Sequence, residues 1–182
     1  MRLALGAAAL CLAASPALAA PAPVIPPQPP TTVSSLTVYP KTDPPKIVSS
    51  YPAAGAVVAP GVLVLKVTFD QKMLKTGFAF AAGPGGQMPA CLKTPRLLND
   101  DKTFVLLCTI GANSSYSIAI NPGPQGGFAN VGETRAEPTT LAFATNADPG
   151  PTDLAAAMKA EKLTDVDEPI QESEFAPPAA RP

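Results

Sequence analysis

Carboxylates are the side chains of this sequence best able to do acid–base chemistry, because the chain contains no histidine. Histidine is the commonest general base and a frequent transition-metal ligand. The acids in the central part of the chain are few and scattered: Asp70, Asp100, Asp101, Glu133 and Glu137. No nucleophile and base form a recognisable pair, so we expect the protein not to be an enzyme and to hold no metal or cofactor.

A long Gly- and Pro-rich connection, residues 121–139, is the best candidate for a binding surface. Loops of this length are uncommon unless they bind something or are disordered. Phe128 and Arg135 are its expected contact residues. A loop without a partner explains the same composition, and both interpretations stay open.

The first 19 residues have the pattern of a secretory signal peptide. Arg2 supplies the positive start, and residues 3–14 form an apolar run that is too short to span a bilayer comfortably. Residues 15–19 end in the small-x-small pattern of a cleavage site. Cleavage after Ala19 is favoured over cleavage after Ala20, because the second cut would place proline directly after the broken bond. These features predict a periplasmic or secreted protein.

Two cysteines remain after removal of the signal, because Cys11 lies in its apolar run and follows leucine rather than the small residue of a lipidation site. An exported chain with two cysteines is expected to pair them, so we predict a Cys91–Cys108 disulfide. A hairpin folded about the Asn99–Asp100 peptide would place these residues directly opposite each other. The same register would set Lys93 against Leu106 and Pro95 against Phe104, and it leaves open which face carries the bridge. The alternative is a pair of buried thiols.

The overall composition favours short strands and turns. The 182 residues include 24 prolines and 13 glycines, and 13 basic residues balance 14 acidic ones. The near-zero net charge gives no indication of nucleic acid binding. No apolar run of membrane length follows the signal, so we expect no transmembrane segment in the mature chain.

Alternating apolar residues predict seven strands between residues 46 and 146. The strongest covers residues 62–69, where Leu63, Leu65, Val67 and Phe69 form one apolar face. Seven short strands in about 100 residues predict an all-β, immunoglobulin-like (Ig-like) sandwich. The other six are expected at residues 47–48, 78–80, 90–98, 102–110, 116–121 and 141–145.

The segments on either side of this domain are predicted to be extensions. Residues 20–45 are a Pro-rich linker, within which residues 33–39 are either an edge strand or part of the linker, the second being favoured. Residues 147–182 form a tail with a short helix over residues 153–163 and a disordered acidic, Pro-rich end. A solvated tail is favoured over a specific docking peptide that ends around Phe175.

Three motifs, in order along the chain, resemble the bacterial Ig-like domain named for the surface-layer protein SbsA. The first is PKIVSSYPAAGAV at residues 45–57 with LVLKVTFDQKM at residues 63–73. NSSYSI at residues 113–118 and LAFAT at residues 141–145 follow. The segment ANVGE at residues 129–133 departs from the family, because it lacks the leading acid of the usual Asp-x-x-Gly-Asn. The resemblance implies an exported, non-enzymatic module that binds an envelope protein or a glycan, or has a structural role.

The opening motif is also similar to that of periplasmic copper carriers of the CopC type. Those carriers hold copper through histidines, whereas this chain has none and its methionines are scattered. A small periplasmic carrier is therefore the second, disfavoured interpretation.

Export predicts a defined mature N-terminus. N-terminal sequencing of the protein from the periplasm or medium should begin at Ala20. An intact Met1 on protein from the cytoplasm would contradict the signal peptide.

Overall fold

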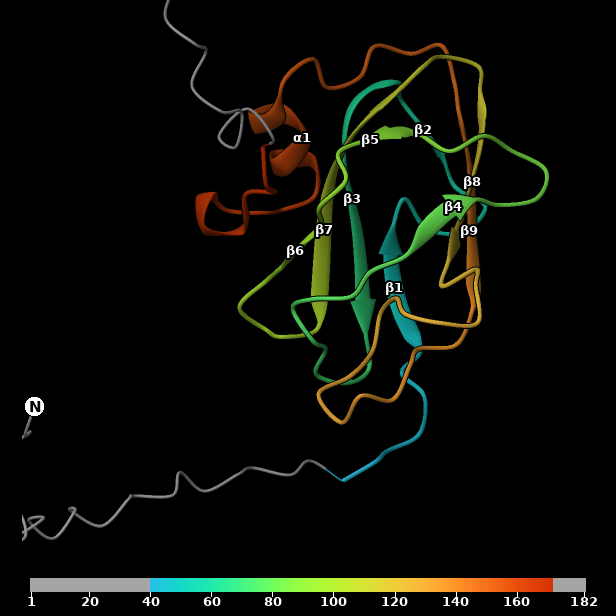
Figure 1. Ribbon diagram of the computed structural model, residues 1–182. Helices are drawn as coiled ribbons and strands as arrows, with labels where there is room; N and C mark the ends of the chain where they lie inside the picture. The colour runs from blue at the N-terminus through green and yellow to red at the C-terminus, as the bar shows by residue number, and fades with distance from the viewer. Residues whose placement is uncertain (1–39, 172–182) are drawn as a thin grey trace, which may run out of the picture. The chain divides into compact units, whose positions relative to one another are not determined.

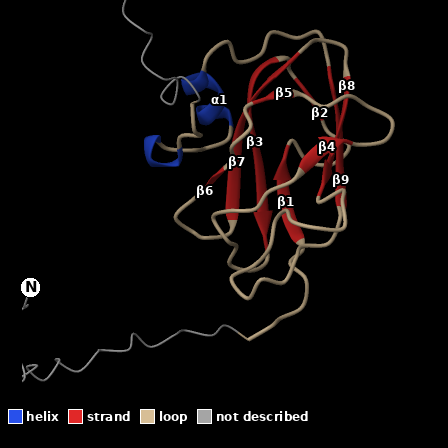
Figure 2. Cartoon of the chain, in the orientation of Figure 1, coloured by secondary structure: helices blue, strands red, loops and turns tan. Residues whose placement is uncertain are grey.

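The computed structural model describes residues 40–171, which form a mainly β structure with one short α-helix (Figures 1 and 2). The predicted signal peptide, the possible edge strand at residues 33–39 and the end of the tail from residue 172 lie outside the described residues. Within residues 40–171, no helix has the length and hydropathy needed to cross a membrane.

The strands form two sheets. The first has the order β1-β3-β7-β5, with β6 also pairing with β7, and the second has the order β2-β9-β8-β4. All the pairings are antiparallel except that β2 lies parallel to β9. The bounds in the first sheet are β1 Ile47–Tyr51, β3 Gly61–Phe69, β5 Ala90–Cys91, β6 Arg96–Leu97 and β7 Thr103–Ile110. Those in the second are β2 Val57–Val58, β4 Phe80–Ala82, β8 Ser115–Ile120 and β9 Thr139–Thr145.

The main core lies between the facing sides of the two sheets. The predicted apolar face of β3 is confirmed, because each of its four members is at most 4% exposed. Strand β8 contributes Tyr116, Ile118 and Ile120 from the other sheet, and β9 contributes Leu141 and Phe143. Apolar residues that face the core alternate here with small or polar residues that face outward. Because a one-residue shift would turn the apolar residues outward, this alternation determines the register of the second sheet.

The hairpin from β5 to β7 differs from its predicted register. Near the turn, Arg96 lies opposite Val105 and Leu97 opposite Phe104, so the predicted pairing of Pro95 with Phe104 is wrong. The chain turns between Leu98 and Thr103, whose N–H and C=O groups are 2.8 Å apart, and the turn is centred on the Asp100–Asp101 peptide.

Aspartate chemistry explains the position of this turn. Asp100 Oδ1 accepts hydrogen bonds from the backbone N–H groups of Lys102 and Thr103, both at 2.9 Å. Asp101 adopts a positive φ of 57°, a conformation that aspartate tolerates better than most residues. In a turn centred one peptide earlier, as predicted, neither the hydrogen bonds accepted by Asp100 nor the positive φ of Asp101 would have the same role.

Cys91 nevertheless lies opposite Cys108, as predicted, and the two form a disulfide. The predicted strand 90–98 is interrupted after β5, where Pro95 has no N–H to donate. Two extra residues in this interruption offset the displaced turn, so the register at the cysteines is the predicted one. Cys108 is 2% exposed and Cys91 packs against the same core, so the bridge lies on the core side of the first sheet.

Helix α1, Leu154–Ala160, covers the other side of the first sheet (Figure 1). Asp153 caps it by accepting a hydrogen bond from the N–H of Ala156 at 2.8 Å. Ala157 and Met158 pack with Val64 and Val105, both fully buried, so the central strands are covered on both faces. The helix is shorter than the predicted 153–163.

The acidic segment after α1 is ordered as far as it is described, which corrects the expectation of disorder for residues 165–171. Residues Asp165–Asp167 form a 3-10 helix. Arg96 of β6 donates to the carbonyls of Val166 and Glu168, both at 2.6 Å. The sequence pattern drew attention to the acidic side chains, whereas the backbone carbonyls hold the segment in place.

Removal of the disulfide tests its contribution to stability. The double variant C91A/C108A should lose about 3 kcal/mol of the free energy of unfolding, because the bridge restricts the unfolded chain over a separation of 17 residues. Urea unfolding of the oxidised wild type and the variant measures this difference, and reduction of the wild type should reproduce most of it. Two free thiols in the non-reduced exported protein would contradict the bridge.

Candidate functional site

Phe128, a predicted contact residue of the 121–139 loop, belongs to the core. Its side chain is 1% exposed, so the prediction that it contacts a partner is wrong. Its ring centroid lies 4.8 Å from that of Phe104, 5.1 Å from Phe80 and 5.6 Å from Phe69. Aromatic pairs at these distances stabilise a core beyond the area that they bury.

The loop is held by side-chain hydrogen bonds to its own backbone. Buried Asn121 accepts from the N–H of Phe128 and donates to the carbonyls of Phe128 and Ala136, all within 3.0 Å. Arg135, the other predicted contact residue, donates to the carbonyls of Gly126, Asn121 and Gly123. Phe128 and Arg135 therefore anchor the loop and do not form a shared binding surface.

The carboxylates considered for chemistry act mainly as hydrogen-bond acceptors in turns. Although partial burial opposes the change, hydrogen bonds from Thr103 and the backbone lower the pKa of Asp100. Asp70 accepts from the N–H of Lys46 at 2.9 Å, and Asp101 lies 3.3 Å from the ammonium of Lys72. Among residues 40–171, no group of three or more His, Cys, Asp or Glu side chains has the arrangement of a metal site.

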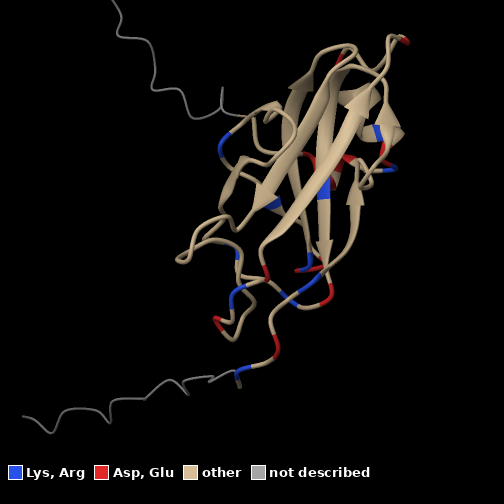
Figure 3. Ribbon diagram, turned by 90° about the vertical axis from the view of Figure 1, so that its right-hand side faces the viewer, with Lys and Arg blue, Asp and Glu red and all other residues tan. Residues whose placement is uncertain are grey.

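The outward side of the second sheet is a surface of small, uncharged residues. The register pairs Val57 with Ala144 and Ala144 with Ser115. It pairs Ala142 with Ser117, Thr140 with Ala119, and Ala119 with Ala81. None of the residues in β2, β4, β8 and β9 is charged. Figure 3 views the molecule from this side, where the charged residues lie mainly in loops. We call these eight residues the outer face: Val57, Ala81, Ser115, Ser117, Ala119, Thr140, Ala142 and Ala144.

Glycines let the chain after β4 lie close to this face. A Cβ atom at Gly86 would come within 2.8 Å of the backbone of Tyr116. The N–H of Gly83 donates to Ser117 at 2.8 Å, and that of Ser117 donates to Gln87 at 3.0 Å. Ser117 is 1% exposed as a result, whereas Thr140 and Ala142 remain exposed.

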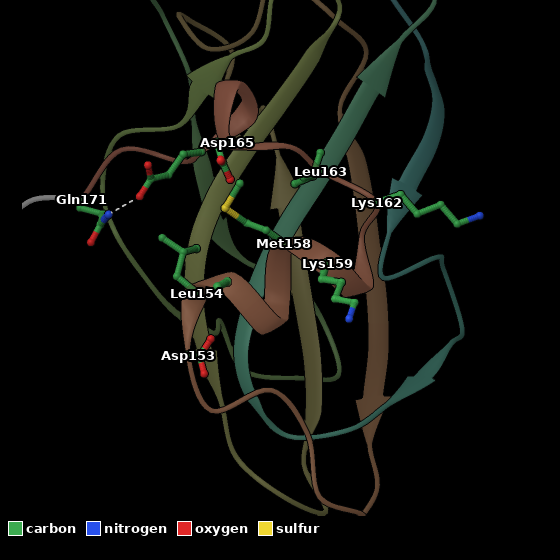
Figure 4. Close-up of a pocket in the computed structure, with 10 residues that line it drawn as sticks. Asp153, Leu154, Met158, Lys159, Lys162, Leu163, Asp165 and Gln171 are labelled. Carbon is green, nitrogen blue, oxygen red and sulfur yellow. Dashed lines mark hydrogen bonds between the residues drawn. The ribbon is translucent and has the colours of Figure 1, made fainter.

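A pocket of about 780 Å³ lies beside helix α1, on the other side of the domain (Figure 4). We call it the α1 pocket. Leu154, Met158 and Leu163 supply its apolar lining. Figure 4 shows Gln171 on one side of these residues, Lys159 and Lys162 on the other, and Asp165 next to Met158. Its remaining lining residues are Asp153, Ala155 and Glu168.

An ion pair between buried Glu161 and half-buried Lys66 attaches the end of α1 to the first sheet. Glu161 is 6% exposed, and its carboxylate lies 3.2 Å from the ammonium of Lys66 on β3. The same ammonium donates to the Glu161 carbonyl at 3.2 Å. Burial raises the pKa of Glu161, although Lys66 opposes the shift, and burial next to this carboxylate also raises the pKa of Tyr51.

Neither the α1 pocket nor this ion pair was predicted from the sequence. The narrow apolar stripe of the predicted helix, formed by Leu154 and Met158, was a weak signal for the α1 pocket. Lys66 shares a strand face with Val62 and Val64, and two apolar neighbours on one face were a signal that this face is covered.

Comparison of the sequence with models of protein families found no match, and a search of curated proteins also found none.

Removal of the Lys66 charge tests the ion pair. K66M should lower the free energy of unfolding by about 3 kcal/mol at neutral pH, because Glu161 would be left buried without its partner. The double variant K66M/E161L should recover most of this loss, since it removes both charges. Urea unfolding of the four proteins gives the comparison.

The loss in K66M should also depend on pH. A carboxyl whose pKa is raised by burial binds its proton more readily in the folded state, so its contribution favours folding at low pH and is lost as pH rises through the folded pKa. Acidification should therefore reduce the difference between K66M and the wild type. An equal loss at acidic and neutral pH, or no recovery in the double variant, would contradict this account.

Proposed function

We propose that the chain is a non-enzymatic, exported Ig-like module that binds a protein of the cell envelope. The strand order supports an Ig-like sandwich. If β1, β3, β7 and β5 are taken as strands A, B, E and D, the first sheet has the order ABED of a constant-type immunoglobulin domain. Strands β4, β8 and β9 then correspond to C, F and G, with β2 as an additional strand beside G.

Tyr116 gives independent support for this fold. It lies near the start of β8, the proposed strand F, and its hydroxyl accepts a hydrogen bond from the N–H of Gly111 at 2.7 Å. A tyrosine that bonds back to the preceding corner is a hallmark of Ig-like domains. The disulfide differs from that of antibody domains, because it joins neighbouring strands of one sheet instead of bridging the two sheets.

The outer face is the observation on which the binding function rests. A sheet face with small, uncharged side chains allows another protein surface to approach closely, with little cost of removing charges from water. Among residues 40–171, none of the Phe or Tyr side chains is exposed. Ligand sites commonly use aromatic side chains, and exposed rings would be expected for stacking on sugars, so a protein partner is favoured over a glycan.

The copper-carrier alternative has less support. The resemblance in the opening motif is common to both families, but the chain has no histidine to supply the carrier's ligands. An SbsA-type module therefore remains the preferred proposal.

Site-specific photo-crosslinking in the producing cells tests this function. A photoreactive amino acid at Ala142, on the outer face, should capture a defined envelope protein. The matched control is the same probe at Ser49, an exposed position on β1 in the first sheet, and it should not capture that protein. The additional change T140K should abolish capture at Ala142.

Two results would overturn the proposal. One is equal capture at Ala142 and Ser49, which would indicate contact without a specific face. The other is binding of the purified protein to isolated cell-wall glycan with no protein captured at either position, which would replace the protein partner with a glycan.

A further inference from the structure

A short segment of the chain between β4 and β5 crosses part of the outer face. We call it the 83–86 strap, after its residues Gly83, Pro84, Gly85 and Gly86. Figure 1 shows the chain between β4 and β5 projecting beyond β8, on the side of the second sheet that faces away from the first. A Cβ atom at Gly83 would overlap the hydroxyl of Ser117 and lie 3.0 Å from Cγ2 of Thr140. The strap therefore lies over β8 and reaches toward β9.

Backbone hydrogen bonds at its two ends hold the strap in place. The N–H of Gly83 donates to the C=O of Ser117 at 2.8 Å, and the N–H of Ser117 donates to the C=O of Gln87 at 3.0 Å. The N–H of Gln87 donates to the C=O of Ser115 at 3.1 Å. The only side chain of the strap is that of Pro84, which is exposed. Because the strap buries no large apolar side chain, few interactions oppose its separation from the sheet.

The closed strap leaves a buried polar group without a partner. Ser117 is 1% exposed, and its hydroxyl has no hydrogen-bond partner among residues 40–171. A buried hydroxyl that makes no hydrogen bond destabilises the state in which it is buried. Withdrawal of the strap would expose this hydroxyl to water or to a binding partner. The closed state is therefore destabilised in a way that the open state is not.

We propose that the 83–86 strap is a gate of the outer face, which covers Ser117 in the free protein and moves away when the partner binds. The partner then covers Ser117 in its place and forms a hydrogen bond with the hydroxyl, so that Ser117 joins Thr140 and Ala142 in the contact surface. This inference rests on the proposed function of the outer face. It adds a control of access, because the fraction of molecules with an open strap limits the apparent affinity for the partner.

Amide hydrogen exchange, resolved by NMR, tests the gate without a partner. In the wild type, the N–H groups of Ser117 and Gln87 should exchange faster than the slowest amides of the β3–β7 pair, because the strap opens without global unfolding. G83A should speed the exchange of both groups about tenfold, because its methyl group overlaps Ser117 when the strap is closed. The matched control is G123A, in another exposed loop, whose added Cβ meets no atom within 4 Å. It should leave both rates unchanged.

S117A supplies a variant with the opposite effect. It removes the hydroxyl that the closed strap leaves without a partner, so the exchange of the Gln87 N–H should slow several-fold. Urea unfolding of each variant shows that it is folded. Exchange of the wild-type Ser117 and Gln87 amides only as slow as the slowest of the β3–β7 pair would overturn the gate. Failure of either G83A or S117A to move the Gln87 rate in its expected direction would also overturn it.

Photo-crosslinking from Ala142 connects the gate to binding. G83A should increase capture of the envelope protein relative to the wild type, S117A should decrease it, and G123A should leave it unchanged. Capture in the wild type that neither G83A nor S117A alters would overturn the gate and leave the proposed function in place. No capture in any of the four proteins would overturn the proposed function, and with it the role of the gate in binding.

Discussion

Burial of the β3–β7 pair on both faces is the constraint on which the rest of the structure depends. One face of β3 meets the second sheet through Leu63, Leu65 and the residues that follow in alternation. The other face meets α1 through Val64. Each buried aliphatic side chain contributes about 1.5–3 kcal/mol relative to an exposed one, so neither covering layer is dispensable. The disulfide and the Lys66–Glu161 pair attach peripheral segments directly to this central pair of strands, and the Arg96 contacts attach another segment through β6, which pairs with β7.

The sequence was sufficient to predict the parts of the fold that depend on local alternation. The core face of β3 and the pairing of the cysteines follow from spacing along single strands, and both are present. The register beside the turn was predicted wrongly for two reasons. Composition does not reveal that the turn is centred on the Asp100–Asp101 peptide, and Pro95 interrupts a strand that was predicted to be continuous. The displaced turn and the interrupted strand compensate for each other at the cysteines, and this compensation depends on the whole hairpin.

Residues far apart in the sequence explain the remaining errors. Phe128 lies in a Gly-rich loop with no periodic pattern. It is a core residue only because Phe69, Phe80 and Phe104, from three different strands, pack against it. Arg135 was likewise predicted to be a contact residue, but its N–H groups donate to nearby backbone carbonyls. The outer face was also missed, although its residues were visible in the sequence. Its serines, threonines and alanines were visible as the polar or small half of each strand, but only the strand order brings them together as one surface.

The cover that α1 provides has a consequence for where the domain can be cut. The β-strands end at Thr145, and a sequence-based boundary at residue 146 would remove Ala157 and Met158 from above Val64 and Val105. Val64 and Val105 would then be exposed on adjacent strands, as part of an apolar patch of the kind that promotes aggregation. A fragment designed for expression should therefore continue through residue 171, since poor solubility of the shorter one would reflect an uncovered sheet and not a failure of the strands to pair.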